Sequence, residues 1–228
     1  MFFFKKKPTI LSSGYFNGFT DYHCHILPGV DDGVRRMEDT LEILAEYEKR
    51  GVKTVWCTPH IMEDIPNTTQ RLQERFRQLQ EAYKGSIQLN LAAEYMIDGL
   101  FDQRLKEGDL LPLGPSKDQI LVETSYFNPP LHFEQTLGEI KSKGFYPVLA
   151  HPERYMYMSD KDYYKKLRMN GIRFQMNLAS LAGVYGNTAK KKAEMLLQEG
   201  FYDYTGTDLH NIDLLDAIYE VKRPIELK

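Results

Sequence analysis

The chain has 228 residues, of which 42% are hydrophobic, and this is enough to form the core of one large α/β domain. Its mean hydropathy of -0.48 excludes an integral membrane protein, and a net charge of -3 gives no sign of a general nucleic-acid binder. Its two cysteines, Cys24 and Cys57, predict no disulfide framework, so we expect a cytoplasmic protein.

The start of the chain is the reverse of a secretory signal, because three apolar residues precede the first lysines. We expect residues 1–18 to form a flexible N-terminal tail without stable membrane insertion. We expect residues 19–228 to form one domain with no internal repeat.

Strand and helix patterns alternate along the rest of the chain, which is typical of a parallel sheet with crossover helices. Apolar runs predict seven strands, over residues 19–25, 52–57, 87–93, 120–122, 146–150, 172–176 and 202–205. Helical spacing of apolar residues predicts helices over 39–49, 68–83, 97–106, 131–143 and 189–199, and a last one from about residue 214. A barrel built from these units would gather its strand ends at one mouth.

Histidine, aspartate or glutamate follows six of the seven predicted strands. Nine such side chains are candidate metal ligands: His23, His25, Asp32, His60, Glu94, Glu123, His151, Asp208 and His210. Two of them, His23 and His25, lie two positions apart in a strand, so their side chains point to the same face. The distribution predicts a cluster of metal ions at the mouth of the barrel.

Single members of this set have simpler explanations. Asp32 would fit an ordinary turn, His60 a surface loop, and His151 a hydrogen-bonded core imidazole. Glu94 and Glu123 are harder to explain, because a carboxylate that follows an apolar run is costly to bury without a partner or a metal. Their joint position at the strand ends favours the metal cluster.

Seven motifs follow one another in a fixed order: Asp-Tyr-His-Cys-His, Val-Asp-Asp-Gly, Thr-Pro-His, Ala-Ala-Glu-Tyr, Val-Glu-Thr-Ser, Ala-His-Pro-Glu-Arg-Tyr and Gly-Thr-Asp-Leu-His-Asn. In these motifs the chain resembles the PHP (polymerase and histidinol phosphatase) superfamily over about residues 19–215. It is most similar to the bacterial protein-tyrosine phosphatase branch of the CpsB/CapC/YwqE type, which accompanies capsule and exopolysaccharide tyrosine kinases. The resemblance implies an α/β fold, a distorted seven-stranded (β/α) TIM-like barrel, and a metallophosphatase domain over 19–228.

The resemblance also implies a trinuclear site and its ligands. Three sets are expected, namely His23, His25, Glu94 and Asp208 for one metal, Glu94, Glu123 and His151 for a second, and Asp32, His60 and His210 for the third. Mixed imidazole and carboxylate ligands suit Mn, Fe or Zn, and the resemblance favours Mn. Arg154 is the expected catalytic phosphate clamp, because its guanidinium can bind two phosphate oxygens at once. Its simpler interpretation is a surface ion pair with Glu153.

The expected chemistry is hydrolysis of a phosphate monoester. Three divalent ions would carry more positive charge than four carboxylates neutralise, and this surplus suits binding of a phosphate dianion. A bound metal ion can also lower the pKa of water and so produce a hydroxide nucleophile. The resemblance implies a metal-dependent protein-tyrosine phosphatase acting on the phosphotyrosine-containing tail of a bacterial tyrosine kinase. Alternatives are a histidinol-phosphate type phosphatase, a nuclease, which the lack of basic charge disfavours, or a catalytically weak scaffold for the kinase. The sequence leaves the oligomeric state of the protein open.

The chain departs from the tyrosine phosphatase branch at one position. Branch members usually carry a further arginine shortly after the motif that ends at Asn211, whereas Leu215 stands at the matching position and the next arginine is Arg223. We therefore expect turnover or substrate preference to differ. Four aromatic residues are candidates to stack on a phosphotyrosine ring, with packing as the alternative: Tyr126, Phe127, Tyr155 and Tyr157.

Overall fold

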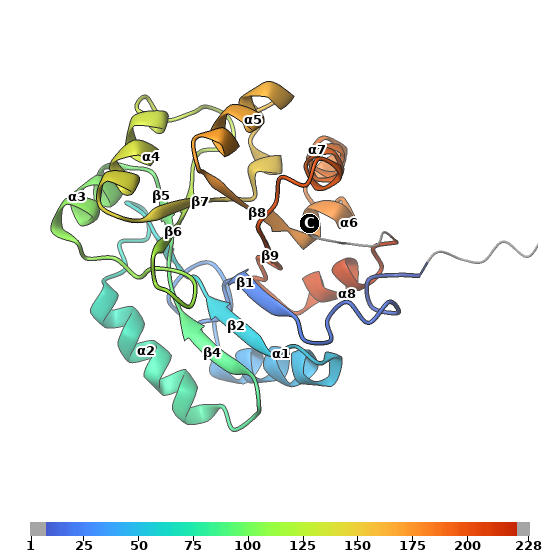
Figure 1. Cartoon of the computed structure of the whole chain (residues 1–228). Helices are drawn as coiled ribbons and strands as arrows, with labels where there is room; N and C mark the ends of the chain where they lie inside the picture. The colour runs from blue at the N-terminus through green and yellow to red at the C-terminus, as the bar shows by residue number, and fades with distance from the viewer. Residues whose placement is uncertain (1–7, 223–228) are drawn as a thin grey trace, which may run out of the picture.

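A computed structural model of the chain describes residues 8–222, in which parallel strands form two sheets with helices around the outside (Figure 1). The strands are β1 (Thr20–Cys24), β2 (Thr54–Cys57), β3 (His60–Ile61), β4 (Gln88–Leu91), β5 (Glu94–Met96), β6 (Gln119–Glu123), β7 (Tyr146–Ala150), β8 (Arg173–Asn177) and β9 (Tyr204–Gly206). The helices are α1 (Met37–Arg50), α2 (Thr69–Ala82), α3 (Gly99–Glu107), α4 (Phe133–Ser142), the 3-10 helix η1 (Pro152–Arg154), α5 (Lys161–Met169), α6 (Leu178–Ala182), α7 (Gly186–Gln198) and α8 (Asp213–Tyr219).

The smaller sheet has the strand order β1-β2-β4 and the larger has the order β3-β5-β6-β7-β8-β9. Two of the predicted strands, 52–57 and 87–93, are each followed by a short additional strand that belongs to the other sheet. The first break lies at Thr58 and Pro59, between β2 and β3, and the second at Ala92 and Ala93, between β4 and β5. Proline has no amide hydrogen for the ladder, which explains the first break. The described residues thus form an α/β fold with parallel sheets and a half-barrel, and the single seven-stranded barrel stays a prediction.

The two sheets meet where β1 approaches the segment that follows β9. The amide of His25 donates to the carbonyl oxygen of Leu209 at 3.0 Å, and the amide of Asp208 donates to the carbonyl oxygen of His23 at 2.7 Å. These backbone bonds join residues 184 and 185 positions apart in the chain. They bring the first and the last of the predicted ligand motifs into contact.

Local sequence signals explain the ends and the buried faces of the helices. Helix α1 ends at Gly51, which adopts the left-handed conformation (φ 87°) that glycine takes without strain. Helix α2 begins after Thr68, whose side chain accepts from the amide of Arg71. Helix α5 was not predicted from the sequence, although Tyr164 and Leu167 are its buried residues, three positions apart. Its other residues are mostly polar, so the apolar stripe is too narrow to stand out.

Residues 8–18 differ from the flexible tail that the sequence predicts. They form turns in which Ile10 and Phe16 are buried. The amide of Ile10 donates to the carbonyl oxygen of Val221 at 2.7 Å, and the ring of Phe16 meets that of Tyr219 edge-on. Burial of these apolar side chains against the end of the chain offsets the entropy of ordering the segment. Residues 1–7 lie outside the described residues.

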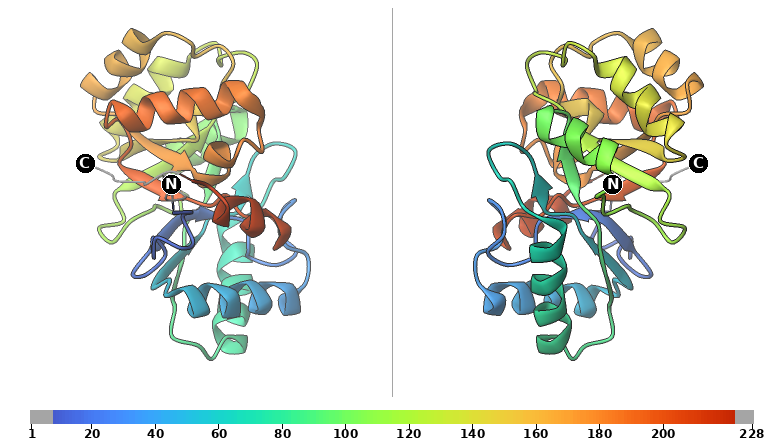
Figure 2. Two further views of the ribbon diagram at one scale, coloured as in Figure 1. Left: turned by 90° about the vertical axis from the view of Figure 1, so that its right-hand side faces the viewer. Right: turned by 90° about the vertical axis from the view of Figure 1, so that its left-hand side faces the viewer.

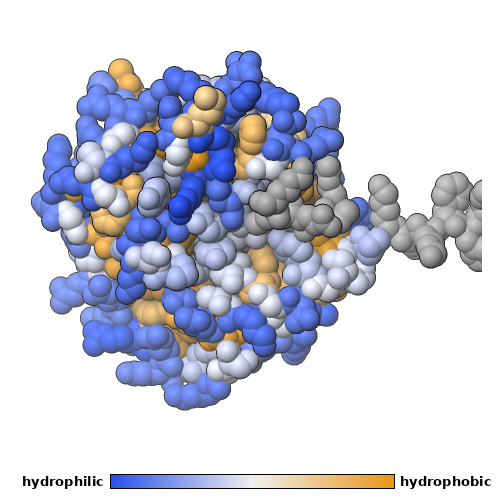
Figure 3. Space-filling model, viewed as in Figure 1, coloured by the Kyte–Doolittle hydropathy of each residue, from blue (hydrophilic) through white to orange (hydrophobic). Residues whose placement is uncertain are grey.

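The core lies between the strands and the helices. All five residues of β6 are buried, as expected for a parallel strand covered on both faces. The side views show α1 and α2 at one side of the molecule, with α4, α5 and α7 at the other (Figure 2). The face drawn in Figure 3 is mainly hydrophilic, with hydrophobic residues in small separate patches. Among residues 8–222, helices long and apolar enough to cross a bilayer are absent.

Candidate metal centre

The structure brings all nine predicted ligand side chains to one end of the parallel strands. Their places are the end of β1 and the turn after it (His23, His25, Asp32), the starts of β3 and β5 (His60, Glu94), the end of β6 (Glu123), the residue after β7 (His151) and the loop after β9 (Asp208, His210). Six of the nine are at most 2% exposed. Parallel strands therefore concentrate these side chains as the sequence predicts, while their role as ligands stays a prediction.

His60 and Glu94 begin short strands, whereas the sequence predicts that each follows the end of a longer one. The breaks at Pro59 and Ala93 allow the chain to continue as β3 and β5. In this register His60 is the direct neighbour of Glu94 in the parallel ladder. Their side chains therefore leave the sheet on the same face and reach the same site.

Four of the side chains form the most deeply buried group, with the same membership as the first expected ligand set. The Nε2 atom of His23 lies 3.1 Å from Glu94 Oε2 and 3.5 Å from Asp208 Oδ1. The Nε2 atom of His25 lies 3.3 Å and 3.2 Å from the same two oxygens. One ligand atom from each residue falls within 4.8 Å of all the others. A tetrahedral ion could take all four.

The second group surrounds Glu94 and Glu123. The Nε2 atom of His151 lies 3.0 Å from Glu94 Oε1 and 3.8 Å from Glu123 Oε2. The donor group that forms here has His60 as its third member, where the expected set has His151; the Nδ1 atom of His60 lies 3.2 Å from Glu94 Oε2 and 3.1 Å from Glu123 Oε1. Glu94 Oε2 thus lies near nitrogen atoms of both groups and Oε1 near His151, an arrangement that a bridging carboxylate would have.

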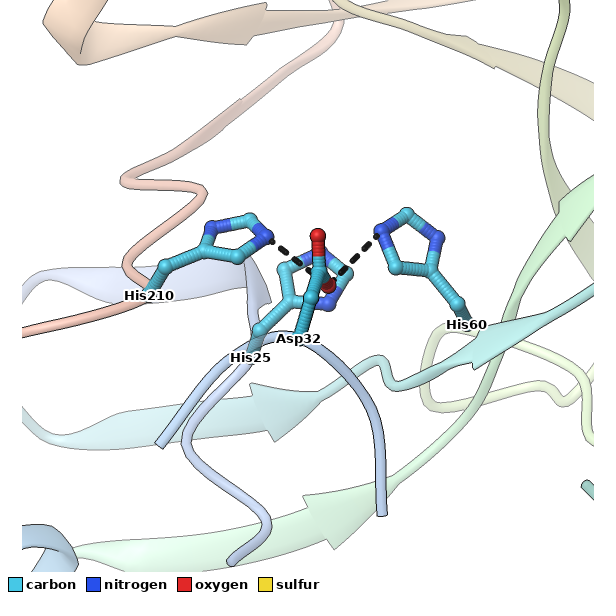
Figure 4. A group of neighbouring side chains, drawn as sticks. All are labelled: His25, Asp32, His60 and His210. Atoms are coloured by element: carbon cyan, nitrogen blue, oxygen red, sulfur yellow. Dashed lines mark ion pairs between the residues drawn. The ribbon is translucent and has the colours of Figure 1, made fainter. Parts of the chain in front are cut away.

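The third group lies nearest to solvent and comprises His25, Asp32, His60 and His210 (Figure 4). Asp32 Oδ1 lies 3.6 Å from His60 Nε2 and 3.5 Å from His210 Nε2. The side chain of Asp32 is 63% exposed, whereas that of His60 is 11% exposed. The three residues of the expected set therefore lie close together, and His25 joins them as a fourth member of the group.

Two supporting residues determine which nitrogen of each buried histidine carries its hydrogen. Gln175 Oε1 lies 2.8 Å from His23 Nδ1, and Asp31 Oδ2 lies 2.9 Å from His25 Nδ1. The amide of Gln175 is oriented by its bond from Nε2 to the carbonyl oxygen of Met176. Both acceptors require a hydrogen on Nδ1, so the neutral rings turn their lone pairs toward each other through Nε2.

Those two Nε2 atoms lie only 3.1 Å apart. Facing lone pairs beside the buried carboxylates of Glu94 and Asp208 are unfavourable unless a cation lies among them. Glu94 Oε2 also lacks a hydrogen-bond donor although it is fully buried. The donor set thus fits a divalent metal ion held by imidazole and carboxylate, with Gln175 and Asp31 orienting the ligands.

In the metal-free protein, protons on the imidazoles would balance the carboxylates. Burial acts to lower the pKa of His23, but the charges of Glu94 and Asp208 outweigh it and raise that pKa to about 9. Burial acts to raise the pKa of Glu94, but the charged rings of His23 and His60 outweigh it and hold that pKa well below its usual range. A hydrogen bond from His210 lowers the pKa of Asp32 to about 2. The site therefore retains its carboxylates in the ionised form that binds metal.

Two of the candidate ligands have strained backbones. His151 has a φ of 33° and Asp208 a φ of 51°, both in the left-handed region that residues with a side chain rarely adopt. Backbone strain of this kind persists where surrounding structure enforces it and is concentrated at functional sites. His151 follows β7 directly and Asp208 lies two residues after the end of β9, so the turn of the chain after each strand directs these side chains toward the site.

A pocket of about 640 Å³ opens above the three groups, and Arg154 forms part of its wall. The Nη1 atom of Arg154 donates to Asp208 Oδ2 at 2.8 Å. The simpler interpretation, a pair with Glu153, is wrong, because that buried carboxylate accepts from the amide of Asn177 and the hydroxyl of Tyr202. Arg154 thus lies where a phosphate clamp is expected.

Of the four candidate aromatic residues, Tyr126 lines the pocket. Tyr155 is buried and its hydroxyl donates to the carbonyl oxygen of Ala150, so it serves packing. The hydroxyl of Tyr157 shares a hydrogen bond with Thr124, and Phe127 is 68% exposed. Of the four candidate aromatic residues, Tyr126 alone is among the residues that line the described pocket.

Four residues that support the site were missed in the sequence. They are Gln175 and Asp31, which hold His23 and His25, Asn177, which donates to Asp208 Oδ2, and Tyr185, which lines the pocket. Gln175 lies in the one predicted strand that has no ligand at its end. A polar amide inside that apolar run was the signal that could have identified it.

The position that matches the further arginine of the branch does not face the pocket. Leu215 is 1% exposed and packs in the core, whereas Leu214, Ala217 and Asp213 of α8 line the pocket. The part of the pocket wall that α8 contributes is thus apolar and acidic. Arg223 lies outside the described residues.

Both cysteine side chains are buried away from the pocket. Cys24 and Cys57 are fully buried and face each other across β1 and β2. Cys24 ends β1 between His23 and His25, so its side chain leaves the opposite face of the chain from theirs. Neither thiol is placed to attack a substrate in the pocket.

Comparison with known proteins shows which family the chain belongs to. The family of capsular polysaccharide synthesis proteins of the CpsB/CapC type matches residues 19–215, so the chain belongs to this family. It is 31% identical over 197 residues to the tyrosine-protein phosphatase YwqE of Bacillus subtilis (strain 168), covering 84% of this chain and 77% of that protein. It is 26% identical over 212 residues to the tyrosine-protein phosphatase CpsB of Streptococcus agalactiae, covering 85% and 84%.

The fold is also found among solved structures. One chain from a study of YwqE from Bacillus subtilis and CpsB from Streptococcus pneumoniae, described as metal-dependent tyrosine phosphatases, matches with a TM-score of 0.78 and 28% identity. The match covers 86% of this chain and 81% of that chain. The resemblance drawn from the sequence motifs is therefore confirmed at the level of the family.

Proposed function

We propose that this protein is a metal-dependent protein-tyrosine phosphatase that removes phosphate from the tail of a bacterial tyrosine kinase and so regulates capsular or exopolysaccharide synthesis. The observation that supports this most directly is the set of three overlapping donor groups beneath a pocket that contains Arg154. Named relatives with this fold are metal-dependent tyrosine phosphatases. We further propose that the site holds three ions within a distorted seven-stranded barrel. Mn is the preferred metal, with Fe or Zn as the alternatives.

The ligands proposed for the three ions are the nine residues that the sequence indicates. Bound divalent ions would lower the pKa of water and neutralise phosphoryl oxygens. Glu94 joins the first two groups, and His60 lies between the second and the third. This sharing keeps the positive charges close together, which suits a phosphate dianion.

Arg154 is the protein side chain that would bind the phosphate together with the metal ions. Its side chain is 16% exposed and its guanidinium is held at Asp208, beside the first metal group. A planar fork in a partly dry pocket can bind two phosphoryl oxygens and stabilise charge that develops on them. Tyr126 provides a ring face near the same place, where the phenol of the substrate would lie.

A panel of substrates tests the proposal. The purified protein is loaded with Mn and assayed on a phosphotyrosine peptide, a phosphoserine peptide, histidinol phosphate and single-stranded DNA. We expect turnover to be greatest on the phosphotyrosine peptide and to disappear with a chelator. Preference for histidinol phosphate or DNA would overturn the assignment.

A catalytically weak scaffold is the second candidate, and the wall formed by α8 is the observation in its favour. Leu214, Ala217 and Asp213 there offer no cation to share the phosphate. Stoichiometric metal and tight binding of the kinase tail without turnover would identify this case.

A further inference from the structure

Two tyrosine rings enclose the guanidinium of Arg154. Its Cζ atom lies 4.4 Å from the centre of the Tyr126 ring and 3.9 Å from the centre of the Tyr185 ring. Both rings line the pocket with Arg154. A guanidinium that contacts aromatic faces gains cation–π attraction and loses freedom to rotate.

The third contact of Arg154 links it to the metal groups. Its Nη1 atom donates to Oδ2 of Asp208, which also accepts from Nδ2 of Asn177 at 2.7 Å. The other oxygen of Asp208 faces the Nε2 atoms of His23 and His25. The rings and Asp208 together define the plane and the direction of the guanidinium.

Tyr185 is held in a tight turn between α6 and α7. The turn lies between Gly183 and Gly186, whose φ values are 83° and 88°. The amide of Val184 donates to the carbonyl oxygen of Ala179, and that of Gly186 to Gly183. Because the turn is closed by backbone bonds, Tyr185 is presented to the pocket from a defined position.

We propose that Tyr185 is a positioning residue that, with Tyr126, keeps the guanidinium of Arg154 directed at the phosphoryl group. The inference rests on the proposed function and adds that Tyr185 acts through Arg154 and not through the ring of the substrate. Arg154 is the arginine of the described pocket wall, and α8 presents Leu214 and Ala217. A lone clamp depends more on being held in place before the substrate arrives.

Inorganic phosphate is the probe that separates the two roles, because it has no ring to stack. Its affinity for the Mn-loaded protein is measured by calorimetry for wild type, Tyr185→Ala, Tyr185→Leu and Tyr185→Phe. We expect the two variants without a ring to bind phosphate about fivefold to thirtyfold more weakly. Tyr185→Phe retains the ring face and should remain close to wild type. Unchanged phosphate affinity in both Tyr185→Ala and Tyr185→Leu would overturn the inference.

A matched control lies outside the pocket. The Cζ atom of Arg173 lies 4.5 Å from the centre of the Tyr146 ring, which is the same kind of pair at a 46% exposed position. Tyr146→Ala should leave phosphate affinity unchanged. Metal content and melting temperature are measured for every variant, and Tyr185→Leu preserves apolar volume if Tyr185→Ala folds poorly.

A double-mutant cycle then tests the route of the effect. If Tyr185 acts through Arg154, Tyr185→Leu should cause no further loss of phosphate affinity in an Arg154→Ala background. Independent, multiplying losses would overturn the inference. A wild-type protein that hydrolyses no phosphotyrosine would refute the proposed function alone, since phosphate binding still decides the role of Tyr185. Wild-type protein that binds no phosphate would overturn the role of Tyr185 as well.

Discussion

The Nε2 atoms of His23 and His25 lie 3.1 Å apart, while the Nδ1 atom of each ring faces a hydrogen-bond acceptor. In the proposed metal site, this relationship would make the two rings a preformed pair of ligands. It also makes the pair dependent on Gln175 and Asp31, which hold the hydrogens on the outer nitrogens. Supporting residues of this kind typically contribute tenfold to hundredfold to metal affinity.

The first prediction concerns Gln175. Gln175→Met retains the size of the side chain but removes the acceptor for His23, so we expect metal affinity to fall by about tenfold to hundredfold. Gln175→Glu keeps an acceptor at the same place and serves as the control. Competition with a metal-binding dye measures both. Wild-type affinity in Gln175→Met would show that the hydrogen bond does not orient His23.

The second prediction concerns the number of ions. Glu94 belongs to two of the donor groups, whereas Asp32 belongs to one. We therefore expect Glu94→Ala to lower metal content at two sites and Asp32→Ala at one, each with a loss in kcat of more than about 10²-fold. Elemental analysis of purified variants measures the content. Equal stoichiometry in wild type and both variants would contradict the assignment. His60 is a poorer single-site variant, because it belongs to two groups.

The third prediction concerns the phosphate clamp. Arg154→Lys keeps the charge but loses the planar fork, so kcat/KM on a phosphotyrosine peptide should fall by at least about tenfold. Metal content should stay unchanged, because Arg154 is not among the donor groups. Steady-state kinetics and elemental analysis on the same preparation separate the two effects. Full activity of Arg154→Lys would show that another residue binds the phosphoryl oxygens.

The fourth prediction concerns the missing second arginine. An arginine at Leu215, the position that matches the branch, would be buried in the core, since Leu215 is 1% exposed. Leu215→Arg should therefore destabilise the protein by about 3 kcal/mol or more. Leu214→Arg places the guanidinium in the pocket and should raise kcat/KM on phosphotyrosine peptides by about tenfold. Thermal melts and kinetics of the two neighbouring variants compare these outcomes, and higher activity in Leu215→Arg would contradict the register of α8.

The fifth prediction concerns the stability of metal-free protein at alkaline pH. The folded-state pKa of His23, at about 9, lies above the usual 6.5. Its protonation therefore stabilises the fold fully below about pH 6.5, and this contribution, at most about 3 kcal/mol, is lost as the pH rises through about 9. Thermal melts in the presence of a chelator should show this loss.

The metal-loaded protein should respond to pH in the opposite direction. Metal ions bind neutral imidazole and ionised carboxylate, so binding strengthens as protons leave. Melting with Mn should therefore show stability that falls as the solution is acidified. Parallel pH curves with and without metal would contradict the placement of metal at the histidines.

The sequence by itself predicted the family, the α/β class and the nine residues that converge. This was possible because parallel strands place the residues that follow them at one end of a sheet, whatever the rest of the packing does. The spacing of His23 and His25, and the motifs around Glu94 and His151, carried this information locally. Arg154 was predicted on a different ground, namely its match to the phosphate clamp of the family, three residues after His151.

The tertiary structure alone decided which residues support the site and how the strands divide. Gln175 meets His23 across 152 positions of the chain, and Tyr185 reaches Arg154 from a different loop, so no local pattern joins these pairs. The orientation of α8, which buries Leu215 and presents Leu214, depends on packing against the core. Local patterns specify which side of a strand a residue occupies, whereas contacts between distant segments arise only when the whole core is packed.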